Sequence, residues 1–138
     1  MSFREKIAWL SVTTTVIVWG TYLAFLLTTA QPLPPPAQFG GFFAAVVVQT
    51  ILVIAGSIIT AILSPGDAGA PSDERDKAVS RAAYALAYPV LLSLIVCIAA
   101  SLYLGVDAQG MTYEIMAAIV IAEIVHYGAQ IVGYRRGA

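Results

Sequence analysis

Hydrophobic residues in this chain gather into four long runs separated by short polar or proline-rich segments. The runs cover about residues 7–29, 39–63, 82–106 and 115–134. Each run approaches or exceeds the ~20 residues that a helix needs to cross the ~30 Å hydrocarbon layer of a membrane. The pattern predicts an all-α fold, an integral membrane four-helix bundle forming one domain over residues 1–138.

The basic residues all fall on one side of this predicted membrane. Two precede the first run, three lie between the second and third runs, and two follow the fourth: Arg4, Lys6, Arg75, Lys77, Arg81, Arg135 and Arg136. The other two loops carry none. Because basic residues beside short spans stay in the cytoplasm, we expect a multi-pass protein with both termini and the central loop in the cytoplasm.

Composition agrees with a membrane protein. The chain is 59% hydrophobic and 11% charged, and its mean hydropathy is +0.84. A soluble domain of this size would have too little polar surface to cover itself. The net charge of -1 supplies no basic field for nucleic acid. We therefore expect the lipid bilayer as the main partner, together with further copies of the chain or other membrane proteins.

A cleaved signal peptide is the alternative interpretation of the first run. Residues 3–6 would form its charged start, and Thr28, Thr29 and Ala30 a poor cleavage site. The apolar run from Ile7 to Leu27 is longer than the ~7 to 15 residues of a signal core, which favours a retained span. Cleavage would leave three spans and an N-terminus outside the cell.

The connecting segments differ in character. Residues 31–38 are rich in proline and predict a short, stiff, extended connector. Residues 64–71 form a glycine- and proline-rich breaker, after which Ser72 or Asp73 can cap a helix that begins in the cytoplasm. The outer segment 105–112 carries only Asp107 and is expected to be a short loop.

The two halves of the chain show a weak resemblance to each other. At an offset of 73 residues, the stretch 44–48 matches 117–121, and similar basic–acidic–basic triplets open the first and third runs. This suggests an internal repeat of two hairpins, 1–66 and 72–138, related by an axis along the membrane normal.

Small residues predict where the helices approach each other closely. In lipid, helices associate through small residues and interhelical hydrogen bonds. Four such rows occur, one per run: Gly20, Ala24 and Thr28; Gly56 and Thr60; Ala85, Pro89, Ser93, Cys97 and Ser101; Ala129 and Gly133. We interpret the single cysteine as a packing residue and expect a kink at the proline. Tyr84 is expected to anchor its helix at the membrane interface.

Polar residues along the fourth run carry the candidate chemistry. Glu123, Tyr127 and Gln130 are spaced four and three apart and share one helical face, with His126 one position round. We call these four residues the polar stripe. At ~1.5 Å per residue, Glu123 lies about 18 Å along the helix from Arg135, near the middle of the bilayer. An isolated carboxylate there costs at least ~2.5 to 3.5 kcal/mol, so we expect it to face the bundle.

Two interpretations of the polar stripe compete. In one, Glu123 and His126 form a proton-titrating site in a small transporter or channel. In the other, which we favour, a protonated Glu123 and a neutral His126 are hydrogen-bonding groups that hold the helices together. One histidine and one cysteine per chain are too few for a metal site or for two axial haem ligands, and no cofactor is expected. The chain also lacks a nucleophile positioned beside its histidine and a glycine-rich phosphate loop, so we expect no enzyme.

Charged residues at the predicted cytoplasmic ends form a second candidate feature. Asp73, Glu74, Arg75 and Asp76 precede the third run, and Arg135 and Arg136 follow the fourth. The two motifs, DERD and YRRG, resemble a pattern in small four-span prokaryotic membrane proteins of unknown function, over residues 73–137. The resemblance implies a prokaryotic protein of the inner membrane and points to no particular activity, and it would bring both motifs together on the cytoplasmic face. Helix capping and anchoring explain the same residues more simply.

Taken together, these features predict a non-enzymatic structural, accessory or signalling component of a larger membrane assembly. A small proton-coupled transporter or channel that uses Glu123 and His126 is the alternative.

Overall fold

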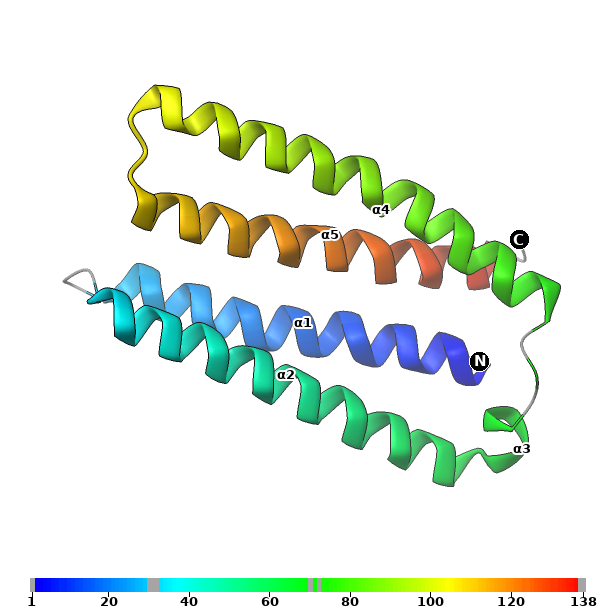
Figure 1. Ribbon diagram of the computed structural model, residues 1–138. Helices are drawn as coiled ribbons and strands as arrows, with labels where there is room; N and C mark the ends of the chain where they lie inside the picture. Colours follow the sequence, from blue (N-terminus) through cyan, green and yellow to red (C-terminus); the bar gives the residue numbers. More distant parts are fainter. Residues whose placement is uncertain (1, 30–32, 70, 72, 137–138) are drawn as a thin grey trace. The chain divides into compact units, whose positions relative to one another are not determined.

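The computed structural model describes residues 2–29, 33–69, 71 and 73–136, and nearly all of them are helical (Figure 1). Four long helices are present: α1 (Phe3–Thr28), α2 (Pro35–Leu63), α4 (Glu74–Ser101) and α5 (Ala108–Arg136). Two short elements, α3 (Pro65–Ala68) and the 3₁₀ turn η1 (Leu102–Leu104), follow α2 and α4. The described residues contain no strand, and all four long helices are long and apolar enough to cross a membrane. The predicted all-α class with four potential spans is confirmed.

The chain divides into two compact units, Met1–Pro71 and Ser72–Ala138. In the first unit, α1 and α2 lie side by side as a hairpin, and α4 and α5 do the same in the second (Figure 1). Each unit therefore buries helix contacts of its own. The proposed repeat of 1–66 and 72–138 has compatible boundaries, and a duplication stays a prediction.

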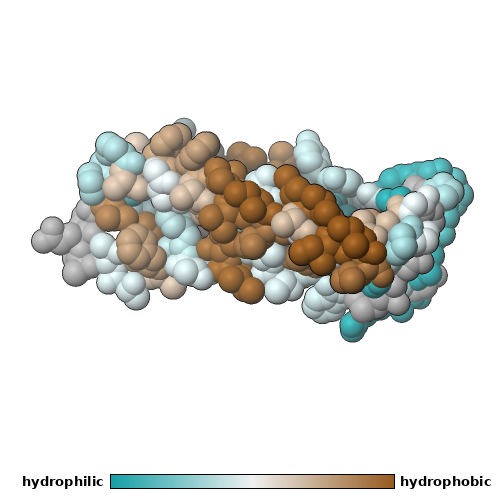
Figure 2. Space-filling view, turned by 90° about the horizontal axis from the view of Figure 1, so that it is seen from below, coloured by the Kyte–Doolittle hydropathy of each residue, from teal (hydrophilic) through white to brown (hydrophobic). Residues whose placement is uncertain are grey.

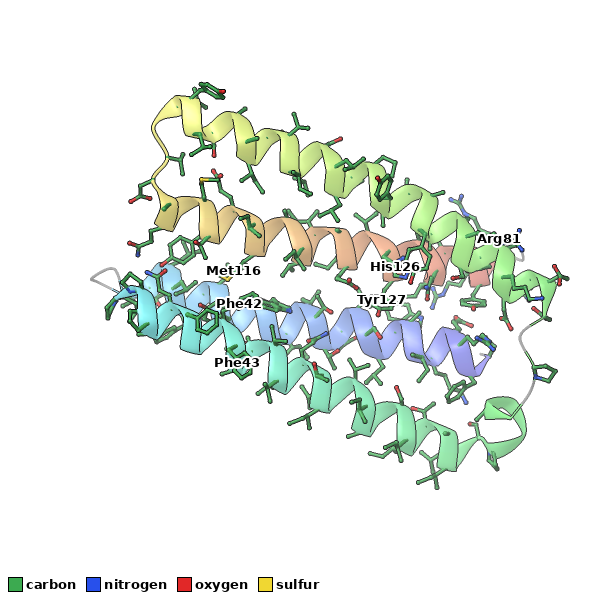
Figure 3. The ribbon with its side chains drawn as sticks, viewed as in Figure 1. Phe42, Phe43, Arg81, Met116, His126 and Tyr127 are labelled. Carbon is green, nitrogen blue, oxygen red and sulfur yellow. The ribbon has the colours of Figure 1, made fainter. Side chains whose placement is uncertain are left out.

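Small residues bring α1 and α2 together. A Cβ atom on Gly56 would lie 2.6 Å from Cδ2 of Leu10, so this glycine lets the two helices approach. Nearer the other end, the rings of Trp19 and Phe42 pack with centroids 5.5 Å apart, whereas Phe43 points outward (Figure 3). The predicted row at Gly56 is confirmed. The row that begins at Gly20 is wrong for this hairpin, because a Cβ there would meet nothing within 4 Å.

Hydrogen bonds also join α1 to α2. The Gln49 amide donates to the hydroxyl of Thr15 over 2.8 Å, and Thr15 is only 2% exposed. The Tyr22 hydroxyl donates to the carbonyl oxygen of Gln38 over 3.0 Å. Polar side chains within apolar helices are thus used for interhelical contact in the first unit.

The contact between α4 and α5 uses a different face of α4 from the predicted one. Val79, Ala83 and Ala87 are buried at spacings of four, and a Cβ on Gly133 of α5 would lie 2.9 Å from Cγ1 of Val79. In the predicted row on α4, only Ser101 is buried, and Cys97 is exposed. The prediction was wrong because small residues occur on two faces of α4, and only one face meets α5. Helix α4 continues through Pro89, and the expected kink there stays a prediction.

Two loops are shorter than predicted. Pro35 begins α2, and Pro36 follows in its first turn, where the backbone N–H groups have no intrahelical acceptor and a proline costs little. The extended connector of residues 31–38 is therefore wrong from Pro35 onward, and residues 30–32 lie outside the described residues. At the other loop, α5 begins at Ala108 rather than after Thr112, because the Asp107 carboxylate accepts a hydrogen bond from the Gly110 N–H over 2.8 Å and caps the helix. Gly105, with φ 86°, makes the turn before it.

The start of α4 agrees with the helix cap predicted from the sequence. The Asp76 N–H donates to the Asp73 carboxylate over 2.7 Å, and the Asp73 N–H donates back to the Asp76 carboxylate over 3.3 Å. This reciprocal capping box confirms Asp73 as the cap. The alternative cap, Ser72, lies outside the described residues.

The outer surface of α2 is strongly apolar. None of its most hydrophobic 18-residue window is buried, and Ile51 and Ile58 are both more than half exposed. The view from the α2 side shows hydrophobic side chains gathered in the middle of this face (Figure 2). Such a surface needs lipid or other helices to cover it.

Candidate functional site

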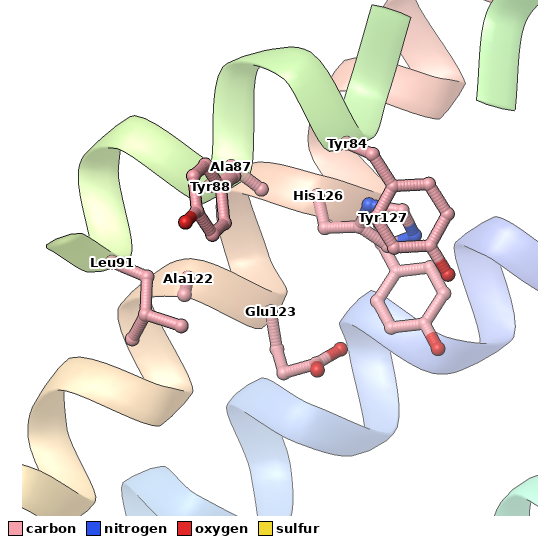
Figure 4. Close-up of a pocket in the computed structure, with 8 residues that line it drawn as sticks. All are labelled: Tyr84, Ala87, Tyr88, Leu91, Ala122, Glu123, His126 and Tyr127. Atoms are coloured by element: carbon pink, nitrogen blue, oxygen red, sulfur yellow. The ribbon is translucent and has the colours of Figure 1, made fainter. Parts of the chain in front are cut away.

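A groove of about 210 Å³ opens between α4 and α5 in the second unit (Figure 4). Its wall from α4 consists of residues spaced by three or four positions, and α5 supplies the other wall. The lining residues are Tyr84, Ala87, Tyr88, Leu91, Ala122, Glu123, His126 and Tyr127. The groove is thus mainly aromatic and aliphatic, with one carboxylate and one imidazole.

His126 is the buried polar group of the groove, with 8% of its surface exposed. It lies on the side of α5 that faces α4, and its ring centroid is 4.2 Å from that of Tyr84 (Figures 3 and 4). The Gln130 amide nitrogen lies 2.9 Å from Nε2 of His126. An amide nitrogen can only donate, so in this orientation of the Gln130 amide Nε2 of His126 is the acceptor. Nδ1 is buried and has no hydrogen-bond partner among the described residues.

Glu123 occupies the opposite environment. It lines the groove one helical turn before His126 and Tyr127, yet it is exposed. Within the described part of the chain, its carboxylate makes no hydrogen bond or ion pair. The four residues of the polar stripe therefore divide: His126 and Gln130 bond to each other, whereas Glu123 shares the groove with them but not their hydrogen bonds.

Sequence reasoning missed the contribution of α4 to this site. Tyr84, expected to be an interfacial anchor, packs its ring on His126. Tyr84, Ala87, Tyr88 and Leu91 recur at positions i, i+3, i+4 and i+7, which is the spacing of one helical face. That spacing was the available signal, although nothing in it identifies α5 as the neighbour.

The charged residues at the ends of α4 and α5 are brought together in part. The Arg75 guanidinium donates to the carbonyl oxygen of Tyr134 over 2.6 Å. Lys77 pairs with Glu74 over 2.8 Å on the surface of α4, and Asp76 belongs to the capping box. Arg135 and Arg136 lie in the last turn of α5, where their positive charges interact favourably with the negative end of the helix dipole. These contacts cap and join helices; Gly137, the end of the predicted motif, lies outside the described residues.

Metal ligands do not cluster in the described residues. No group of three or more His, Cys, Asp or Glu side chains there is arranged to hold a metal ion. His126 is the one imidazole of the chain, and its Nε2 already bonds to Gln130. The groove instead combines ring faces with a carboxylate, which is chemistry suited to a positively charged group.

Comparisons of the chain with protein-family models, with curated protein sequences and with solved structures gave no match. The resemblance of residues 73–137 to small four-span membrane proteins therefore stays a prediction.

Proposed function

We propose that this chain is a multi-pass protein of the cell inner membrane, with both termini in the cytoplasm, and a non-enzymatic structural, accessory or signalling component of a membrane assembly. The exposed apolar face of α2 is the observation that carries this proposal. Contact with lipid or with partner helices removes such a face from water, where its exposure would be unfavourable.

The use of polar groups supports the same proposal. Gln49 bonds to Thr15 in the first unit, and Gln130 bonds to His126 in the second. The bond between Gln49 and Thr15 joins α2 to α1 and supports helix packing, whereas the bond between Gln130 and His126 lies within α5.

Native mass spectrometry of gently solubilised chain tests the assembly role. We expect copies of the chain or co-purifying membrane proteins to remain bound, and to be lost when Ile51 and Ile58 on the exposed face of α2 are both replaced by tryptophan. Val96→Trp, at an exposed position on α4, is the matched control. A wild-type chain that carries only lipid would overturn the assembly role, and release of the chain from membranes by alkaline carbonate would overturn the membrane location.

A proton-coupled transporter or channel is the second candidate, favoured by the groove that holds Glu123 beside His126. A carrier must alternate its carboxylate between charged and neutral states, so Glu123→Gln would abolish movement. In liposomes containing a pH dye, we expect no substrate-induced proton flux with a broad panel of cations and small amines. A flux that vanishes in Glu123→Gln would replace the first candidate with the second.

A further inference from the structure

We propose that the groove between α4 and α5 binds a compact organic cation of the quaternary ammonium class. The proposal concerns binding and holds whether or not the chain moves the ligand. It rests on the proposed membrane location only for the cost of the unpaired carboxylate.

The groove contains a negatively charged group that a cation could pair with. The Glu123 carboxylate lines the groove and pairs with no described residue. A carboxylate without a partner is costly in a membrane-spanning helix. A ligand cation would supply the missing charge.

The groove is also lined by aromatic rings. Tyr84 and Tyr88 from α4 and Tyr127 from α5 line the same groove as Glu123 (Figure 4). A cation within ~6 Å of such a ring centroid is attracted to the ring face, and aromatic cages are a common way to hold quaternary ammonium groups. The aliphatic side chain of Leu91 would contact the apolar part of the ligand.

Size and hydrogen bonding narrow the ligand class. The groove volume of about 210 Å³ is below the ~300 to 1,000 Å³ of pockets for drug-sized molecules. The ligand is therefore small. A metal cation is disfavoured, because the groove offers one carboxylate and a histidine whose Nε2 is already bonded to Gln130.

Isothermal titration of the purified full-length chain in detergent micelles tests the proposal. The probe is choline, and its control is the uncharged alcohol in which carbon replaces the quaternary nitrogen. We expect saturable binding of choline and none of the alcohol. Absence of choline binding, or equal binding of both compounds, would overturn the proposal without any variant being needed.

Variants then locate the site. Glu123→Gln and Tyr84→Leu should weaken choline binding about tenfold or more, whereas Tyr84→Phe, which keeps the ring face, should bind as wild type does. Glu114→Gln is the matched control, because Glu114 lies on α5 outside the groove and accepts a hydrogen bond from Ser101. If Glu114→Gln weakens binding as much as Glu123→Gln does, the groove is not the site. Choline binding by a chain that alkaline carbonate releases from membranes would show that this proposal holds although the proposed location fails.

Discussion

The side chain of Arg75 at the start of α4 donates a hydrogen bond to the backbone carbonyl of Tyr134 near the end of α5, with 2.6 Å between Nη2 and the oxygen. The carbonyl groups in the last turn of a helix have no intrahelical donor. Arg75 therefore satisfies one of them and places positive charge at the negative end of the α5 dipole. One residue thus joins the two ends of the second hairpin.

Replacing Arg75 by glutamine should loosen the end of α5. The loss of a charged contact at a helix C-terminus corresponds to about 0.3 to 1 kcal/mol at an exposed site. Hydrogen exchange measured by mass spectrometry should be faster in the amides of residues 130–136. Arg136→Gln is the control, because Arg136 is exposed at the same end and makes no hydrogen bond or ion pair in the described part of the chain. Equal acceleration in both variants would mean that general charge, and not the Arg75 contact, holds the helix end.

Gly133 should not tolerate a methyl group. A Cβ there would lie 2.9 Å from Cγ1 of Val79, a stiff β-branched side chain that cannot move aside easily. We expect Gly133→Ala to lower the free energy of unfolding by about 1 to 3 kcal/mol, followed as loss of helicity on titration with dodecyl sulfate. Gly128→Ala on the same helix is the control, because a Cβ there has no neighbour within 4 Å. The second change Val79→Ala should recover part of the loss, and no recovery would place the strain elsewhere.

The hydrogen bond between Gln49 and Thr15 should stabilise the first hairpin. A double-mutant cycle with Gln49→Leu and Thr15→Val should give a coupling energy of about 0.6 to 1.7 kcal/mol, the usual size for interhelical hydrogen bonds in membranes. The same detergent titration measures it. Thr50→Val is the matched control, since the Thr50 hydroxyl is exposed and bonds to the carbonyl of Val46 in its own helix. A coupling near zero would show that Gln49 and Thr15 do not support each other.

Single cysteines should report the proposed orientation. In a Cys97→Ala background, cysteines at Ala37 and Ala108 should react with an impermeant thiol reagent in intact cells, and one at Gly66 should not. All three positions are exposed, so accessibility on the protein does not decide the outcome. Labelling of the Gly66 position alone would reverse the assigned sides of the membrane.

Sequence reasoning predicted the helices well and their neighbours poorly. The four apolar runs indicate which segments are helical, because a helix satisfies the backbone polar groups of a long apolar segment within the segment itself. The residues at which the helices begin depend on local features that hydropathy does not report, such as the Asp107 cap of α5 and the prolines in the first turn of α2.

In the candidate site too, the sequence predicts which residues share a helix but not which residues of the neighbouring helix contact them. The position of Glu123 and His126 on one helix follows from their spacing alone. Which face of α4 meets them does not, because α4 carries small residues on two faces. The choice between Ala83 and Ala85 as the contact is made by packing against α5, which brings Tyr84 onto His126.

The division of the chain after Pro71 has a consequence for biosynthesis. The hydrogen bonds and ring contacts that join α1 to α2 involve only residues that the ribosome has translated by the midpoint of the chain. The first hairpin can therefore assemble before the second has left the ribosome, as domains fold one after another during synthesis. Later translation adds a second hairpin whose own contacts, from Arg75 to Tyr134, are equally self-contained.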